Sequence, residues 1–285
     1  MQIVFCKSLL SKYKSSSAST KPNITMKKKL LSIMMLLAIM LSANAQKNSS
    51  SPKQLPKPIQ ELIENMVYVE GGTFTMGSNL ERQELEFGKE DPEHQVTVSP
   101  FFICRYEVTQ DVWDAVMGNN KSLVKGAKLP VGNVCWDDCQ EFVLKLVLMT
   151  GVNFRLPTEA EWEFAARGGN KSRHTKYSGS NTIDSVAWYQ FNSGNKLHTV
   201  GQKAPNELGL YDMNGNVWEW CYDYYARYDK SAQTDPKGAL NSSTNVIRGG
   251  CSGWRPEECS VTSRMGFSPI TAALFGGFRL AATPE

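Results

Sequence analysis

The sequence lacks a strong excess of charge of either sign. It holds 31 Lys and Arg against 28 Asp and Glu, a formal net charge of +3, so electrostatics does not indicate a nucleic-acid partner. Histidine is scarce, and His94, His174 and His198 have no ligand-like spacing. No P-loop, dinucleotide-binding glycine motif or Ser-His-Asp arrangement is present, which argues against nucleotide binding and serine hydrolysis.

No hydrophobic run is long enough to span a membrane. The apolar stretch Leu30 to Leu41 follows three lysines, 27–29, and precedes the small-residue site Ala43-Asn44-Ala45. This pattern is typical of a secretory signal peptide, and it is too short for a spanning helix. We therefore expect cleavage after Ala45, export to the periplasm or medium, and no transmembrane anchor. No cysteine follows the apolar run, so a lipid anchor is not indicated.

The chain divides into four expected parts. Met26 makes a better start than Met1, so residues 1–25 are interpreted as an over-extended N-terminus and 26–45 as the signal peptide. Residues 46–64 are predicted to be a linker, polar and rich in Pro and Ser at its start. Residues 65–285 show no internal repeat and are expected to form one domain.

Six cysteines follow the signal peptide: Cys104, Cys135, Cys139, Cys221, Cys251 and Cys259. An even number of cysteines in an exported protein favours disulfides. The sequence alone does not say which cysteines pair.

Local patterns predict three helices and a few short strands. The first helix follows Thr109 and stops at Gly118; the second covers about 136–149, with an apolar face at i, i+3, i+4 and i+7. The third begins with the capping box of Thr158 and Glu161. Strands are expected at 66–70 and 71–77, around a Gly-Gly turn, and within 95–106, whereas 80–93 is expected to be a loop. Beyond Gly169 the chain has no long periodic segment, and such irregular structure needs metals, disulfides or buried aromatics to stay ordered.

Six segments, in this order and spacing, resemble the formylglycine-generating enzyme family, the sulfatase-modifying-factor domain. They are VEGGTFTMGS (69–78), FFICRYEVTQDVWDAVMG (101–118), RLPTEAEWEFAARGG (155–169), NELGLYDMNGNVWEWCYDYY (206–225), VIRGG (246–250) and GGFRLA (276–281). The resemblance spans residues 65 to 282. It implies an irregular α+β fold, related to C-type lectins, with little regular secondary structure.

The resemblance also implies a reaction. Enzymes of the family oxidise a cysteine of a sulfatase-type peptide to formylglycine, with O2 and a copper(I) ion held by two cysteines. Those cysteines stand fourth and ninth after a Gly-Gly pair, here Gly249-Gly250. The ninth residue is Cys259, but the fourth is Trp254, which cannot ligate copper, and Cys251 stands at the first position.

Three interpretations of these cysteines stay open. Cys251 and Cys259 form a displaced Cu(I) pair and are the catalytic residues; or both are structural and disulfide-bonded; or Cys259 is a free buried thiol. A structural role is favoured, because moving one ligand by three residues disturbs the geometry that a soft metal needs.

The resemblance further implies a Ca2+ site in the loop before Trp220, with oxygens from Asn214, Gly215 and Val217 and a carboxylate from Glu219. Hard oxygen ligands around a tight glycine turn suit Ca2+, whereas an Asn-Gly turn in an aromatic core needs no ion.

A substrate groove is implied at Trp220, Trp254 and Arg264. Core packing of Trp220 and a buried salt bridge of Arg264 are the alternatives. Two functions follow: an exported oxidase acting on a peptide or protein substrate, or a non-catalytic module. The module would bind a peptide, a glycan or an envelope protein of a secretion or gliding machinery.

Overall fold

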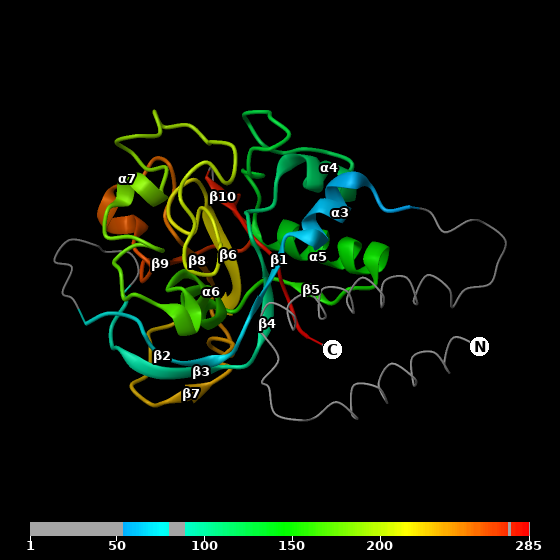
Figure 1. The fold of residues 1–285 in the computed structure, drawn as a ribbon. Helices are drawn as coiled ribbons and strands as arrows, with labels where there is room; N and C mark the ends of the chain where they lie inside the picture. Colours follow the sequence, from blue (N-terminus) through cyan, green and yellow to red (C-terminus); the bar gives the residue numbers. More distant parts are fainter. Residues whose placement is uncertain (1–53, 80–88, 273–274, 285) are drawn as a thin grey trace, which may run out of the picture. The chain divides into compact units, whose positions relative to one another are not determined.

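Three small sheets of short strands form the framework of the domain (Figure 1). The computed structural model describes residues 54–79, 89–272 and 275–284. The predicted signal peptide and most of the predicted 80–93 loop lie outside these ranges. No helix within them is long and apolar enough to cross a bilayer.

The strands are β1 (Met66–Val69), β2 (Gly72–Met76), β3 (His94–Val98), β4 (Phe101–Cys104), β5 (Phe154–Arg155), β6 (Trp218–Tyr224), β7 (Gln233–Thr234), β8 (Asn245–Arg248), β9 (Arg264–Phe267), β10 (Gly276–Gly277) and β11 (Ala281–Ala282). The helices are α3 (Lys57–Glu64), α4 (Gln110–Met117), α5 (Trp136–Thr150), α6 (Glu159–Ala166) and α7 (Ile183–Val186), with 3-10 turns at Gly169–Lys171 and Pro256–Cys259. The mixture confirms the α+β class.

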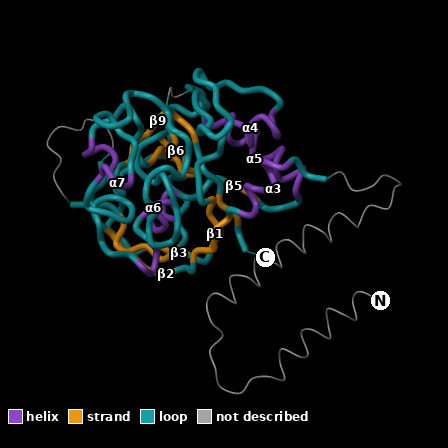
Figure 2. The backbone as a smooth tube through the Cα atoms, turned by 45° about the horizontal axis from the view of Figure 1, so that its top comes forward, coloured by secondary structure: helices purple, strands orange, loops and turns teal. Residues whose placement is uncertain are grey.

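The strand order brings distant parts of the chain together. The sheets have the orders β1-β4-β11-β5, β10-β6-β8-β9 and β2-β3-β7. Figures 1 and 2 show α3, α4 and α5 gathered on one side of the first sheet, and the other two sheets with α6 and α7 on the opposite side. Because β11 pairs with both β4 and β5, the end of the domain is held beside its beginning.

The predicted Gly-Gly turn is not a hairpin. β1 pairs with β4 and β2 pairs with β3, so the chain passes from one sheet to the next at Gly71. A Cβ at Gly71 would lie 2.4 Å from the carbonyl oxygen of Val98. Only glycine allows this close approach of the two crossing segments.

The three predicted helices are confirmed, and a further helix lies where a linker was expected. α5 buries the predicted face, and Thr158 and Glu161 form the predicted capping box of α6. Residues 57–64, however, form α3, which buries Ile59, Leu62 and Ile63. The linker prediction was wrong there, because one short apolar face is enough to dock an eight-residue helix on α4.

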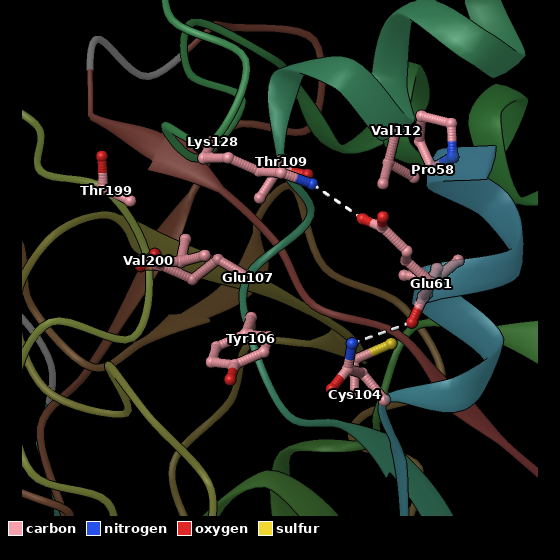
Figure 3. A pocket seen from close by; sticks show the side chains of 12 residues that line it. Pro58, Glu61, Cys104, Tyr106, Glu107, Thr109, Val112, Lys128, Thr199 and Val200 are labelled. Carbon is pink, nitrogen blue, oxygen red and sulfur yellow. Dashed lines mark hydrogen bonds and ion pairs between the residues drawn. The ribbon is translucent and has the colours of Figure 1, made fainter.

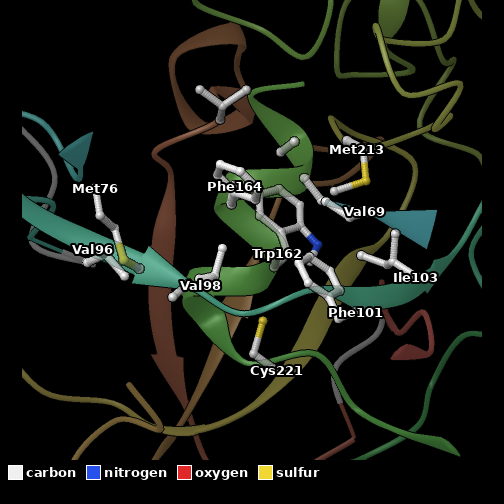
Figure 4. Close-up of a cluster of buried hydrophobic side chains, with 14 of the residues drawn as sticks. Val69, Met76, Val96, Val98, Phe101, Ile103, Trp162, Phe164, Met213 and Cys221 are labelled. Atoms are coloured by element: carbon white, nitrogen blue, oxygen red, sulfur yellow. The ribbon is translucent and has the colours of Figure 1, made fainter. Parts of the chain in front are cut away.

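Helix α6 is the centre of the core. All of its residues are buried, and Trp162 and Phe164 belong to one apolar cluster with residues of β2, β3, β4 and β6 (Figure 4). Its three glutamates each meet an arginine from another element: Glu159 with Arg264, Glu161 with Arg155, and Glu163 with Arg248. A helix this polar can be buried because every carboxylate is paired.

The predicted disulfides are absent from the described residues. All six cysteines after the predicted signal peptide are free thiols; five are buried and Cys135 is half-buried. Cys104, Cys139 and Cys221 lie on β4, α5 and β6, in different parts of the core. The prediction failed because each thiol is used as a small apolar side chain.

Candidate functional site

The segment after β8 begins with two glycines in the left-handed region. Gly249 and Gly250 have φ of 92° and 75°. A Cβ at Gly250 would lie 2.5 Å from the sulfur of Cys259 and 2.7 Å from the carbonyl oxygen of Glu258. The turn is therefore packed directly on Cys259, and the glycine is required for both conformation and space.

Cys251 and Cys259 are enclosed by the fold. Both are 0% exposed, and the Cys259 sulfur lies 3.9 Å from the Cys251 carbonyl oxygen. Burial raises the pKa of Cys251 to about 12 and raises that of Cys259 further above its usual range. The charged side chains that act on them, Glu257 and Glu258, are negative and raise the pKa values as well. Copper ligation needs thiolates, which an electropositive, partly exposed site favours.

Trp254 lies next to this pair, and its N–H donates to the Cys251 carbonyl at 3.0 Å. It packs against the apolar cluster of Tyr177, Ile183, Val186, Ala187, Tyr189 and Cys259. Its ring meets Trp218 edge to face at 5.3 Å, and its carbonyl accepts the Gln190 N–H at 2.9 Å. The structure thus brings together Cys251, Cys259 and Trp254, but as a closed apolar site that does not fit a copper pair.

The predicted calcium loop is held by its own hydrogen bonds. Asn214 accepts the Ser178 N–H at 2.6 Å and donates to the Cys259 carbonyl at 2.6 Å. Its side chain therefore bridges two loops, which leaves the Asn214 backbone carbonyl as the oxygen for the predicted calcium site. Gly215 has a φ of 76° and donates its N–H to the Gly249 carbonyl, which joins this loop to the glycine turn.

Glu219 lies in the core and its carboxylate is paired with the guanidinium of Arg279. Arg279 donates to both of its oxygens at 2.6 and 2.7 Å, and the Trp162 indole donates at 2.7 Å. A carboxylate has about four acceptor positions, so these three bonds leave little capacity for an ion. The contact between Arg279 and Glu219 is therefore a buried salt bridge.

Two further carboxyls, not predicted as site residues, lie around the same loop. Glu107 accepts the Val217 N–H and an Asn216 amide N–H; Asp212 accepts the Gly201 N–H, and its Oδ1 is buried without a partner. Burial and the charges of Asp212 and Glu219 raise the pKa of Glu107, and burial raises that of Asp212 to about 6. Both residues stand inside the quoted motifs, in RYEVTQ and GLYDMNG, so the signal was present in the sequence.

Glu107, Asp212 and Glu219 are thus three carboxyls around Arg279, and the pKa values of two of them are raised. No three His, Cys, Asp or Glu side chains of the described ranges converge as metal ligands. The donor type, the charge and the unpartnered Asp212 oxygen nevertheless fit a hard divalent cation. Glu107 also lines a cavity of about 270 Å³ between α3 and the 199–200 segment, where Lys128 bonds Glu61 (Figure 3).

The predicted groove residues do not lie together. Trp220 is 0% exposed and donates its indole N–H to the Val134 carbonyl at 3.1 Å. It is a core residue, so the groove prediction was wrong for it. Arg264 is also buried and pairs with Glu159 through two nitrogens, at 2.6 and 2.8 Å. It borders a second cavity rather than the surface at Trp254.

Comparison with known proteins settles the family. The family model described as "Sulfatase-modifying factor enzyme 1-like domain" matches residues 52–284. The chain belongs to this family. The formylglycine-generating enzyme of Thermomonospora curvata is 28% identical over 306 aligned positions, which cover 82% of this chain and 97% of that protein.

Other relatives in the family carry different names. The chaperone protein LppX of Paenibacillus barcinonensis is 36% identical over 221 aligned positions, covering 60% of this chain and 75% of that protein. Among solved structures, Treponema denticola variable protein 1 has a TM-score of 0.69 at 34% identity, over 77% of this chain and 95% of that one. The formylglycine-generating-enzyme fold is thus confirmed, but membership of the family does not fix an activity.

Proposed function

We propose that this chain is an exported, non-catalytic member of the formylglycine-generating-enzyme-like family that binds a peptide segment of an envelope protein at the surface around Trp254. One observation carries the proposal: the two cysteines nearest the family's copper position are wholly buried, and Trp254 packs against the apolar cluster that contains Cys259. A substrate thiol would have to reach the metal beside them, and this arrangement leaves it no open ligand position.

The thiol chemistry supports the same conclusion. An oxidase of this family needs two thiolates to hold Cu(I) and an exposed position for the substrate cysteine. Burial and the nearby Glu258 raise the pKa of both Cys251 and Cys259, and Glu257 raises that of Cys259 as well. Trp254 supplies no ligand and adds apolar volume. The site is built to exclude water and charge, which stabilises the fold and opposes copper binding.

The surface beside Trp254 suits a peptide. Phe191 is 71% exposed and meets Tyr189 edge to face at 5.8 Å. The Gln190 N–H bonds the Trp254 carbonyl, so Phe191 and Trp254 lie on adjoining segments. Aromatic side chains that stand at a surface are the usual anchors of protein and peptide interfaces.

Calcium would stabilise the scaffold that presents this surface. Asp212, whose Oδ1 has no partner, and Glu107 would hold the ion, with the backbone carbonyls of Gly215 and Val217. A bound Ca2+ supplies positive charge to a region where burial opposes ionisation of Glu107 and Asp212. The ion would tie the loop that carries Asn214 to the strand before α4, and Asn214 in turn bonds the Cys259 carbonyl.

A Cu(I) competition titration tests the absence of the copper site. The wild type should compete for Cu(I) no better than Cys259→Ser. Trp254→Cys, which restores a cysteine at the family's fourth position, is the matched positive control. Wild-type affinity that depends on Cys259 would overturn the non-catalytic assignment.

Photo-crosslinking in the exporting cell tests the binding surface. Benzoylphenylalanine at position 191 should give a specific crosslink that maps to an extended peptide segment and that Trp254→Ala weakens. Position 240 is the control, because Leu240 is 99% exposed and lies in a different loop. Equal crosslinking from both positions, or an adduct with a glycan, would contradict a peptide site at Trp254.

A further inference from the structure

A second cavity lies at the other end of β6 from Trp218. Its volume is about 170 Å³, and it is enclosed by the ends of β2, β3, β6 and β9, the start of α6 and the 226–239 segment. Since β6 has seven residues, the two ends are roughly 20 Å apart at the usual rise of a strand. This cavity is therefore distinct from the Trp254 surface.

Asp223 forms part of the wall of this cavity. The residue is 2% exposed, and its Oδ2 accepts the Glu159 N–H at 2.8 Å. Among the described residues this is the single hydrogen bond that its carboxyl makes. Burial, with the charges of Glu159 and Glu161, raises the pKa of Asp223 well above its usual range. The cavity wall thus holds a buried carboxyl that has one hydrogen-bond partner among the described residues.

The other charged groups at the floor are already satisfied. Glu159 is held by Arg264 and accepts the Tyr228 hydroxyl at 2.9 Å. The remaining nitrogen of Arg264 donates to the carbonyls of Lys89 and Ala226 at 3.2 and 2.8 Å. Since every Arg264 nitrogen is occupied, the floor offers no cation to an anionic ligand.

The rim adds aromatic surface without adding net charge. Tyr224 is 39% exposed, and the His94 ring packs on Tyr228 at 4.8 Å. Arg227 and Asp229 also line the cavity and carry opposite charges. An acceptor-rich wall with aromatic neighbours favours a ligand that donates hydrogen bonds and carries positive charge.

We propose that this cavity binds the guanidinium or ammonium group of a basic ligand, with Asp223 as its counter-ion. The volume fits a single functional group and its alkyl stem, since sites for drug-sized ligands begin at about 300 Å³. The ligand replaces the proton on Asp223: the carboxyl ionises, its O–H proton passes to solvent, and the cation takes its place. The proposal does not depend on the function of the Trp254 surface.

Isothermal titration with N-acetyl-L-arginine amide tests this directly. N-acetyl-L-citrulline amide is the matched probe, because it has nearly the same shape and no charge. Asp223→Asn is the matched variant, because the amide oxygen still accepts the Glu159 N–H. Asp229→Asn at the rim serves as a second variant that removes an exposed charge and leaves Asp223 in place.

The wild type should bind the arginine probe and not the citrulline probe, and Asp223→Asn should lose about tenfold or more in affinity. Binding should release protons, which is measured by repeating the titration in buffers of different ionisation enthalpy. The Asp223→Asn variant retains the other titratable and charged residues that face the cavity, which are His94, Glu159, Arg227, Tyr228, Asp229 and Arg264. Proton release that persists in this variant would therefore not come from Asp223. Absence of binding, equal binding of citrulline, or an unchanged Asp223→Asn would each overturn the proposal.

The same titration distinguishes the side chain of a peptide from a free amino acid or amine as the source of the basic group. A capped arginine that binds better than free L-arginine identifies the side chain of a peptide as the ligand. The reverse order identifies a free amino acid or amine, whose own charged ends take part in binding. A melting curve of Asp223→Asn shows whether that variant is folded before its affinity is interpreted.

Discussion

Arg279 and Glu219 form a two-armed ion pair in the core, with N–O distances of 2.6 and 2.7 Å and side chains that are 0% and 1% exposed. Arg279 also donates to the carbonyls of Cys104 and Tyr211. The pair therefore connects β6 to β4 and to the loop before the calcium region, and it places structural demands on a residue that sequence reasoning assigned to a metal.

Glu219→Ala should destabilise the protein by about 3–5 kcal/mol, because it leaves the Arg279 charge buried without a partner. Chemical denaturation in EGTA measures the loss. Glu141→Ala is the control, because its pair with Lys145 lies at the surface and should change stability little. A loss that appeared only in the presence of Ca2+ would show that Glu219 acts through the ion instead.

Ca2+ should raise the melting temperature of the wild type and not that of Asp212→Asn or Glu107→Gln. These variants test the site better than Glu219→Ala, because neither residue pairs with an arginine. At a Ca2+ concentration 100 times the dissociation constant, the stabilisation should be about 2.7 kcal/mol. Scanning calorimetry with Ca2+ or EGTA measures it, and an unchanged response of Asp212→Asn would remove the ion from this place.

The reactivity of the thiols should show which of the six cysteines are buried. In the native mature chain, Cys135 should react with Ellman's reagent, because it is half-buried at the start of α5, and the five buried thiols should not. In denaturant without reductant all six should react. Two or four missing thiols under those conditions would show that disulfides form, contrary to the structure.

Asp223 should make stability fall as pH rises. Its folded-state pKa is raised above the usual value of about 3.9, so the folded protein keeps a proton that the unfolded chain releases. Stability from this group is fully present below about pH 4 and is lost as pH rises through the raised pKa, by up to about 1.4 kcal/mol per unit.

Denaturant unfolding of the wild type and Asp223→Asn across this range isolates the effect, because all other titrating groups are common to both proteins. The wild type should lose stability relative to the variant as pH increases. A difference that stays constant with pH would show that Asp223 is ionised in the folded protein.

Local signals in the sequence predicted the elements that depend on neighbours along the chain. The capping box of Thr158 and Glu161, the left-handed stop at Gly118 and the apolar face of α5 need no information from elsewhere. The crossing at Gly71 was missed, because hairpin and crossover connections use the same Gly-Gly signal. Only the partner strands β3 and β4 distinguish them.

The site was harder to predict, because its residues are defined by contacts between distant segments. Trp254 was recognised as a departure from the family's cysteine, and in the structure it packs against the cluster that contains Cys259. Glu107 was missed, because it lies more than a hundred residues before the loop that it contacts through Val217. The bridging role of the Asn214 side chain was not predicted, because an amide in a glycine turn suits either an ion or a backbone bridge.

The most direct test of the non-catalytic assignment is mass spectrometry of a peptide containing C-x-P-x-R. The peptide is incubated in air with the Cu(I)-loaded mature protein and a thiol reductant, beside an active formylglycine-generating enzyme. The account predicts an unmodified cysteine with this protein while the control enzyme converts it. Formylglycine formed by the wild type and lost in Cys259→Ser would contradict the non-catalytic assignment, since the buried pair of Cys251 and Cys259 would have to open and hold copper.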